Sequence, residues 1–246
     1  MALNVPKLLK TNLLLVISIA MLVINLLLIV ILTSFNLLVW KDNRIVYIIF
    51  FYHVSGAWLA YFSFGVSLLS HIQYLRNKKI IFSRIGKNSI IVGVFFTAFT
   101  LITGSLWYNA TSASYGSKPE DYWQWSDPRQ TMTFVLLMSY IAFLIFRSLI
   151  EDKEQKTKLS AALGIALFPT VPLSYFSAII FESFHVLSIK PADPGTIYWN
   201  PLKIFILLFN LIGMTIFFVY IVKQLVDLDK KREKLDILIQ KRLIEA

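Results

Sequence analysis

Only three side chains in this sequence are imidazoles, His53, His71 and His185, and no cysteine accompanies them. Two neutral imidazoles on opposite faces of one iron are a common way to hold haem. A zinc site would need a third or fourth ligand of suitable type, and none is evident near these histidines. His53 and His185 therefore form a candidate axial pair. His71, beside Gln73 and a basic segment, is expected to be a solvated interface residue.

Both candidate ligands also have a plainer interpretation. His53 lies about 12 Å into an apolar run at 1.5 Å per residue, where a neutral imidazole bonded to a neighbouring helix would avoid the cost of burying a charge. His185 follows Glu182 by three residues, so Glu182 could orient its ring if the segment is helical. It could equally be an ordinary interfacial histidine. Position alone leaves both alternatives open.

An aromatic run with charged ends, residues 122–129, reads Tyr-Trp-Gln-Trp-Ser-Asp-Pro-Arg. Asp127 followed by proline is typical of a helix start, with Asp127 as the N-cap. Arg129 in the first helical turn is unfavourable with respect to the helix dipole, so we expect it to pair with an anion such as a haem propionate. Trp123 and Trp125 could stack on a flat ligand or belong to an interfacial aromatic belt, and their spacing does not separate the two.

Six apolar runs must position these residues. Hydrophobic residues make up 57% of the 246 positions and charged residues 15%, against about 25% charged in soluble domains. Runs of about 20 apolar residues cross a bilayer as helices, so we expect an all-α, integral membrane six-helix bundle. The runs are Asn12–Leu32, Ile45–Leu69, Ile90–Tyr108, Thr131–Ile150, Leu159–Phe181 and Leu202–Val222. Pro169 and Pro172 are expected to bend the fifth.

The distribution of basic residues predicts the orientation. Eighteen of the 24 Lys and Arg lie at the termini and in alternate connections, on one side of the predicted bundle. By the positive-inside rule both termini are cytoplasmic, and the tryptophan-rich run faces outward. This asymmetry accounts for most of the net charge of +10, so attraction to anionic lipid is expected rather than nucleic-acid binding. No phosphate-binding loop of the G-x-x-x-x-G-K-[ST] type is present, so coupling to ATP would need another subunit.

Two segments together resemble a known signature. Gly104-Ser105-Leu106-Trp107, followed by residues 122–131, is similar to the tryptophan-rich WWD motif of haem-handling proteins. The resemblance is greatest to the cytochrome c maturation protein C type (CcmC, haem exporter protein C), and includes the His53 segment and Thr170-Val171-Pro172 before His185. The sequence departs from the pattern at Ser126, which separates Trp125 from Asp127, at residues 118–121, which replace a leading Trp-Gly, and at the longer stretch 111–117.

The resemblance implies a haem b bound non-covalently at the outer membrane surface, with His53 and His185 as axial ligands. Trp123, Trp125, Asp127 and Arg129 would lie against the macrocycle. It further implies a cell inner-membrane protein that is not an enzyme and that passes haem to a periplasmic chaperone of the CcmE type. ABC transporter subunits of the CcmA/CcmB type and a small membrane subunit of the CcmD type would be its partners.

The sequence leaves two other classes of function open. A membrane cytochrome would carry electrons between fixed haems and needs histidine pairs at two depths, whereas only one outer pair is expected here. A haem-free permease would show broken helices and internal repeats, and no convincing repeat is found. For domains we expect a six-helix unit at residues 1–226 and a charged helical tail at 227–246. The tail could lie at the membrane interface, pair with a partner or simply extend the last helix.

Overall fold

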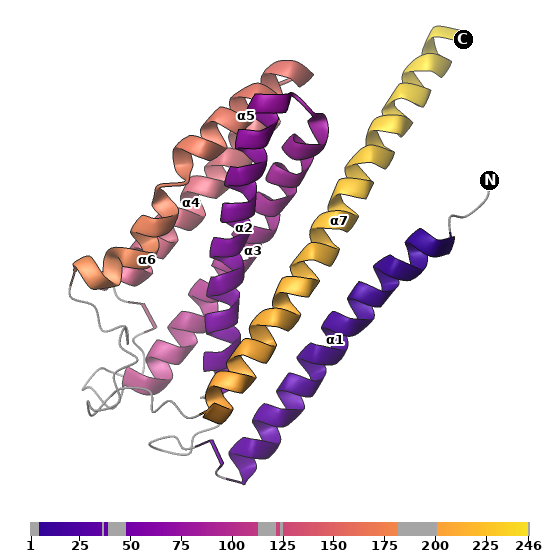
Figure 1. Cartoon of the computed structure of the whole chain (residues 1–246). Helices are drawn as coiled ribbons and strands as arrows, with labels where there is room; N and C mark the ends of the chain where they lie inside the picture. The colour runs from indigo at the N-terminus through magenta and orange to yellow at the C-terminus, as the bar shows by residue number, and fades with distance from the viewer. Residues whose placement is uncertain are drawn as a thin grey trace.

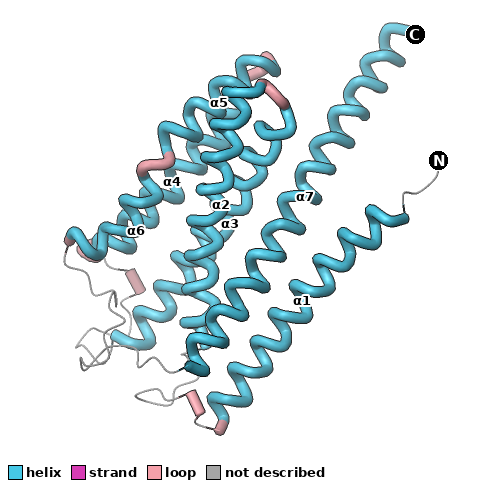
Figure 2. Tube along the Cα trace, in the orientation of Figure 1, coloured by secondary structure: helices cyan, strands magenta, loops and turns pink. Residues whose placement is uncertain are grey.

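The computed structural model describes residues 5–35, 37–38, 48–112, 122–123, 125–181 and 201–245. All regular secondary structure in these ranges is α-helical (Figure 2). The helices are α1 (Val5–Ser34), α2 (Ile48–Asn77), α3 (Ile80–Ser112), α4 (Pro128–Leu149), α5 (Lys153–Leu167), α6 (Thr170–Ile180) and α7 (Pro201–Glu245).

The six predicted spans are confirmed. Helices α1, α2, α3, α4 and α7 are each long and apolar enough to cross a membrane, and α5 with α6 forms the remaining span. The predicted bend in that span is also confirmed, because α5 ends at Leu167 and Pro169 precedes the start of α6. Proline has no backbone N–H to continue the α5 ladder. Pro172 lies in the first turn of α6, where a missing N–H costs nothing.

The helices form two groups (Figure 1). Helices α2 to α6 pack together, while α7 lies along α1 and also contacts α2 and α3. Both termini lie toward the end of the bundle that carries the α2–α3 and α4–α5 turns. The start of α4 and the end of α6 lie at the opposite end, which is called the loop end below. That this end faces outward remains a prediction.

Helices α2 and α3 run antiparallel and pack rings against glycines. Three facing pairs join one ring of α2 to one glycine of α3, namely His53 with Gly104, Phe64 with Gly93, and His71 with Gly86. A Cβ atom on any of these glycines would lie 2.6–2.9 Å from the facing ring. The spacing of 11 and then 7 residues brings the rings back to one face of α2, since 18 residues make five turns.

The expectation that His71 is a solvated interface residue is wrong. Its side chain is 0% exposed, because α5 folds back over this end of α2 and presents Gly164 to the ring. Gly86 covers the ring from α3, and the Phe143 ring of α4 lies 5.8 Å away between centroids. The Ser67 hydroxyl lies 3.3 Å from Nδ1 of His71. His71 is therefore a packing residue that joins four helices.

Amide side chains tie α7 to α2 and α1 to α7. Asn210 of α7 donates to the carbonyl oxygen of Phe51 at 3.1 Å and to the Ser55 hydroxyl at 3.0 Å. Asn25 of α1 donates to the carbonyl oxygen of Ile206 at 2.9 Å. Hydrogen bonds of this kind join helices where apolar packing against lipid gives little preference. The bond to Phe51 fixes α2 two residues before His53.

The charged end of the chain continues α7 without a break and pairs with α3. The Lys87 ammonium lies 2.6 Å from the Asp229 carboxylate, and Asn88 donates to the same carboxylate at 2.8 Å. One turn further along α7, Glu233 pairs with Arg84. These contacts hold the first two turns of the extension against the bundle. A separate unit at 227–246 stays a prediction.

The His71 contacts predict that Gly164→Ala destabilises the protein. The new Cβ would lie 2.4 Å from Nδ1 of His71, and the ring has no room to move away because Gly86 and Phe143 enclose it. Overpacking of this kind costs about 1–3 kcal/mol. Thermal unfolding in detergent should show a lower midpoint than for Gly65→Ala, whose Cβ would meet nothing within 4 Å. Equal midpoints for the two variants would contradict the packing role.

Candidate functional site at the loop end

The helix starts that carry His53 and Arg129 lie at the loop end of the bundle (Figure 1). His53 lies in the first two turns of α2, and Gly104 lies opposite it on α3. Arg129 lies in the first turn of α4. Two of the predicted site residues, 76 positions apart in the chain, thus lie at the same end of the bundle.

The His53 ring packs against Thr103 and Gly104 of α3. Nδ1 of His53 lies 3.1 Å from the Thr103 hydroxyl. The next residue, Gly104, has no side chain, and a Cβ there would lie 2.9 Å from Cε1 of the ring. The glycine of the Gly-Ser-Leu-Trp segment is therefore required by the close approach of an imidazole.

Arg129 lies above the ring of Tyr175, with 5.5 Å between the guanidinium carbon and the ring centroid. A cation above an aromatic face is stabilised by the ring quadrupole. Among the residues that the structure describes, no carboxylate forms an ion pair with Arg129. Tyr175 of α6 therefore explains how a cation is held in the first turn of α4, and the charge of Arg129 remains available to an anion.

A hydroxyl cluster below Arg129 holds the surrounding helices in place. Ser174 of α6 lies 3.1 Å from the Thr133 hydroxyl of α4 and 3.3 Å from the Tyr61 hydroxyl of α2. All three oxygens are buried or half-buried, so each hydrogen bond gains from low solvent screening. Because Tyr175 follows Ser174, the cluster also fixes the ring beneath Arg129.

The predicted helix start at Asp127 is confirmed. Its side chain is 6% exposed and accepts from the backbone N–H of Arg129 at 2.9 Å and of Gln130 at 3.1 Å, with Pro128 as the first helical residue. Ser126 lies in the turn just before this cap. The Thr131 hydroxyl donates to the carbonyl oxygen of Trp125 at 2.9 Å, which folds the aromatic segment back onto α4.

Trp123 and Trp125 form an aromatic group with Phe134 of α4. The three ring centroids lie 5.4–5.9 Å apart, and each pair meets edge to face. Trp125 is 66% exposed, so much of its ring surface is open to a ligand or to lipid. The indole N–H of Trp123 is buried and has no acceptor within the described part of the chain. A buried donor of this kind favours a partner that supplies an oxygen.

Some predicted residues lie outside the described residues. His185 is among them, together with Glu182 and residues 118–121 of the long connection after α3. Of the predicted axial pair, the structure therefore describes only His53. Sequence reasoning in turn missed Thr103, Phe134 and Tyr175. Thr103 adjoins the Gly104 segment, while the two aromatic residues give no signal in a chain with 20 Phe and 11 Tyr.

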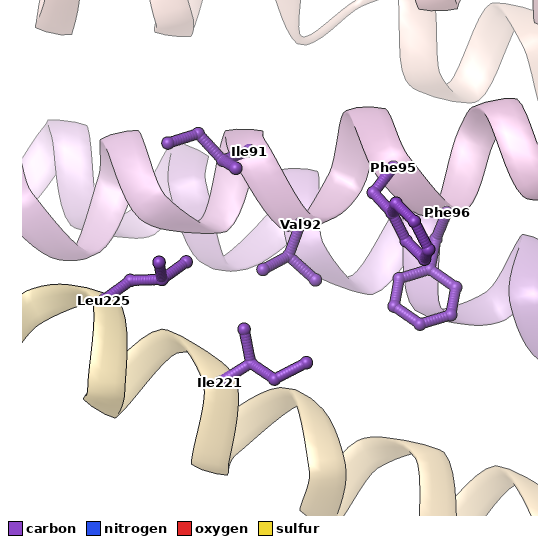
Figure 3. Close-up of a pocket in the computed structure, with 6 residues that line it drawn as sticks. All are labelled: Ile91, Val92, Phe95, Phe96, Ile221 and Leu225. Carbon is purple, nitrogen blue, oxygen red and sulfur yellow. The ribbon is translucent and has the colours of Figure 1, made fainter.

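A separate apolar groove lies between α3 and α7 (Figure 3). Its volume is about 250 Å³, and it is lined by side chains of carbon and hydrogen alone, from Ile91, Val92, Phe95, Phe96, Ile221 and Leu225. None of these groups can ligate a metal or pair with an anion. The groove suits hydrocarbon.

Comparison with known families agrees with the resemblance seen in the sequence. The model of one protein family, described as heme exporter protein C, matches residues 4–236. The chain belongs to the CcmC family. The family is one of membrane transport proteins and not a known enzyme family, and the six spans make this member a multi-pass membrane protein.

Individual relatives are distant. Heme exporter protein C of Bradyrhizobium diazoefficiens is 24% identical over 172 residues, which cover 68% of this chain and 62% of the relative. Heme exporter protein C of Rhodobacter capsulatus is 24% identical over 169 residues, covering 67% and 66%. A ccmC-like mitochondrial protein of cytochrome c biosynthesis from Arabidopsis thaliana is 26% identical over 156 residues, covering 63% and 51%. The chain thus spans about half to two thirds of the length of these relatives.

The cap geometry predicts that Asp127→Ala destabilises the start of α4 whereas Asp127→Asn does not. Alanine removes the acceptor of two backbone N–H groups, and loss of such a cap costs about 0.5–2 kcal/mol. Asparagine retains a side-chain oxygen at the same place. Hydrogen exchange at Arg129 and Gln130 should be faster in the alanine variant and close to wild type in the asparagine variant. Equal exchange in both variants would show that the carboxylate has a role other than capping.

Proposed function

We propose that this protein binds haem non-covalently at the loop end and presents it at the outer face of the cell inner membrane to a haem chaperone of the CcmE type. The observation that carries the proposal is that His53, Arg129 and the Trp123–Trp125 pair lie at the same end of the bundle, at the starts of α2 and α4. Membership of the CcmC family and the names of the relatives support a role in haem handling for cytochrome c maturation.

The chemistry of these side chains fits haem. Haem combines an iron that takes axial imidazoles, a flat apolar macrocycle and two carboxylates. His53 supplies an imidazole held on α3, and in the proposal His185 supplies the second from the segment after α6. Trp123 and Trp125 supply apolar ring surface. The guanidinium of Arg129 and the buried N–H of Trp123 supply donors for carboxylates.

Each side chain then has a separate task. The imidazoles hold the metal, the tryptophans exclude water from one face of the macrocycle, and Arg129 fixes its orientation through a propionate. Asp127 acts on the ligand indirectly, since it caps α4 and so positions Arg129. Because Trp125 is largely exposed, the site is open on one side. An open site suits a carrier that must pass its cargo to another protein.

The buried position of His71 disfavours a two-haem membrane cytochrome. Such a protein needs a second ligated haem near the opposite end of the bundle, and His71 is the only histidine at that depth of α2. Glycines of α3 and α5 lie against its ring, and the side chain is 0% exposed. Helices α3 and α5 would have to separate before a macrocycle could reach it.

The proposed partners are those that membership of the CcmC family implies. The sequence has no phosphate-binding loop, so ATP-driven release of a loaded chaperone would fall to ABC transporter subunits of the CcmA/CcmB type. A small membrane subunit of the CcmD type and membrane lipid would complete the assembly. The orientation rule places the loop end outside, where a periplasmic chaperone could reach it.

The axial ligands can be tested by purification with ample haem. We expect the wild-type protein to carry a low-spin haem spectrum and the His53→Ala/His185→Ala double variant to lose it, because both iron ligands are removed. His71→Ala is the matched control, since His71 is not expected to ligate iron. Colourless wild-type protein would contradict haem binding, and an unchanged spectrum in the double variant would contradict the choice of ligands.

The role of Arg129 can be tested by measuring haem transfer to an excess of apomyoglobin. We expect Arg129→Ala to release haem about 10-fold faster than wild type, as loss of one charge-assisted pair costs about 1.5–3 kcal/mol. Lys118→Ala, which removes a cation from the long connection after α3, serves as the control. If both variants release haem at the same rate, Arg129 does not pair with a propionate.

A further inference from the structure

The hydroxyl of Thr103 lies 3.1 Å from Nδ1 of His53, and its own hydrogen bonds decide whether it donates or accepts there. Thr103 Oγ1 donates to the carbonyl oxygen of Phe99 at 2.8 Å, with the Thr100 carbonyl oxygen at 3.3 Å. A hydroxyl carries one proton, and both of these partners can only accept. The hydroxyl proton of Thr103 is therefore donated to a backbone carbonyl oxygen of α3.

The direction of that proton decides the bond to His53. Nδ1 of His53 lies 3.1 Å from Thr103 Oγ1, and the oxygen can only accept at this contact because its proton is already donated. A neutral imidazole has one N–H, so Nδ1 must carry it and the lone pair must lie on Nε2.

We propose that Thr103 is a positioning residue that fixes His53 as the Nδ1–H tautomer and so assigns Nε2 as the iron-binding nitrogen. The tautomer itself rests on geometry alone, while its use in ligation rests on the proposed function. A histidine that ligates a metal commonly donates its other N–H to an oxygen, which orients the ring and raises its basicity. Here the oxygen belongs to a helix hydroxyl that is itself held by a backbone carbonyl.

Gly104 acts with Thr103. The hydroxyl supplies the acceptor, and the missing side chain next to it lets the ring approach α3 closely enough to use it. A ring pushed outward by a Cβ would lose the 3.1 Å contact. Thr103 and Gly104 thus act together: Thr103 accepts the hydrogen bond, and Gly104 leaves room for the ring.

The haem-free protein provides the direct test, through ¹⁵N NMR of histidine-labelled protein in lipid nanodiscs. Nitrogen shifts separate the two neutral tautomers, and three histidines can be assigned with His71→Gln and His185→Gln variants. We expect His53 in the Nδ1–H form in wild type and in Thr103→Ser, which keeps the hydroxyl. Thr103→Val keeps the shape but removes the acceptor, and we expect it to populate the Nε2–H form. An Nε2–H form in wild type, or an unchanged ratio in Thr103→Val, would overturn the inference.

The haem-loaded protein provides a second readout. Without the acceptor the axial imidazole is less basic, so we expect Thr103→Val to bind haem about 10-fold more weakly and to have a more positive midpoint potential, with Thr103→Ser close to wild type. The two proposals fail separately. If no variant binds haem, the proposed function fails while the tautomer result stands. If haem binds and the potential of Thr103→Val equals that of wild type, only the role of Thr103 in ligation fails.

Discussion

A polar side chain inside hydrocarbon must find its partner within the protein, and the arrangement of this bundle depends on that constraint. Asn25 and Asn210 reach backbone carbonyl groups of neighbouring helices, and Ser174 meets hydroxyls of two others. Each such bond has a direction and a length, whereas apolar contacts against lipid have neither. The polar bonds therefore set which helices meet, and Asn210 does so within one turn of His53.

The same constraint gives the two histidines of α2 different properties. His71 is enclosed by glycines of two helices and serves packing, while His53 keeps a half-buried ring whose one nitrogen is held by α3. The difference arises from what covers each end of α2. Helix α5 closes over His71, whereas His53 lies at the loop end against Thr103 and Gly104 of α3. One helix face thus carries a structural imidazole and a candidate ligand five turns apart.

The spans and the helix start at Asp127 were predictable because they depend on local signals, namely hydropathy, a capping residue and proline. The burial of His71 was not, because it depends on α5 folding back, and a histidine beside a basic segment resembles a solvated one. Thr103 and Tyr175 were missed for a similar reason, since their roles arise only when helices meet. His53 and Arg129 were predicted by local signals, namely a histidine inside an apolar run and an arginine in the first turn of a helix.

The glycines of α3 have a consequence for how sequences of this family can change. Gly86, Gly93 and Gly104 carry no side chain, and a ring of α2 occupies the space that a side chain would need. A larger residue at one of these positions becomes acceptable only when the facing ring becomes smaller, so each pair is expected to vary as a unit among relatives. At Gly104 no larger residue is acceptable as long as His53 is kept. Evolutionary freedom along α3 should therefore be lowest where α2 carries an imidazole and greater where it carries phenylalanine.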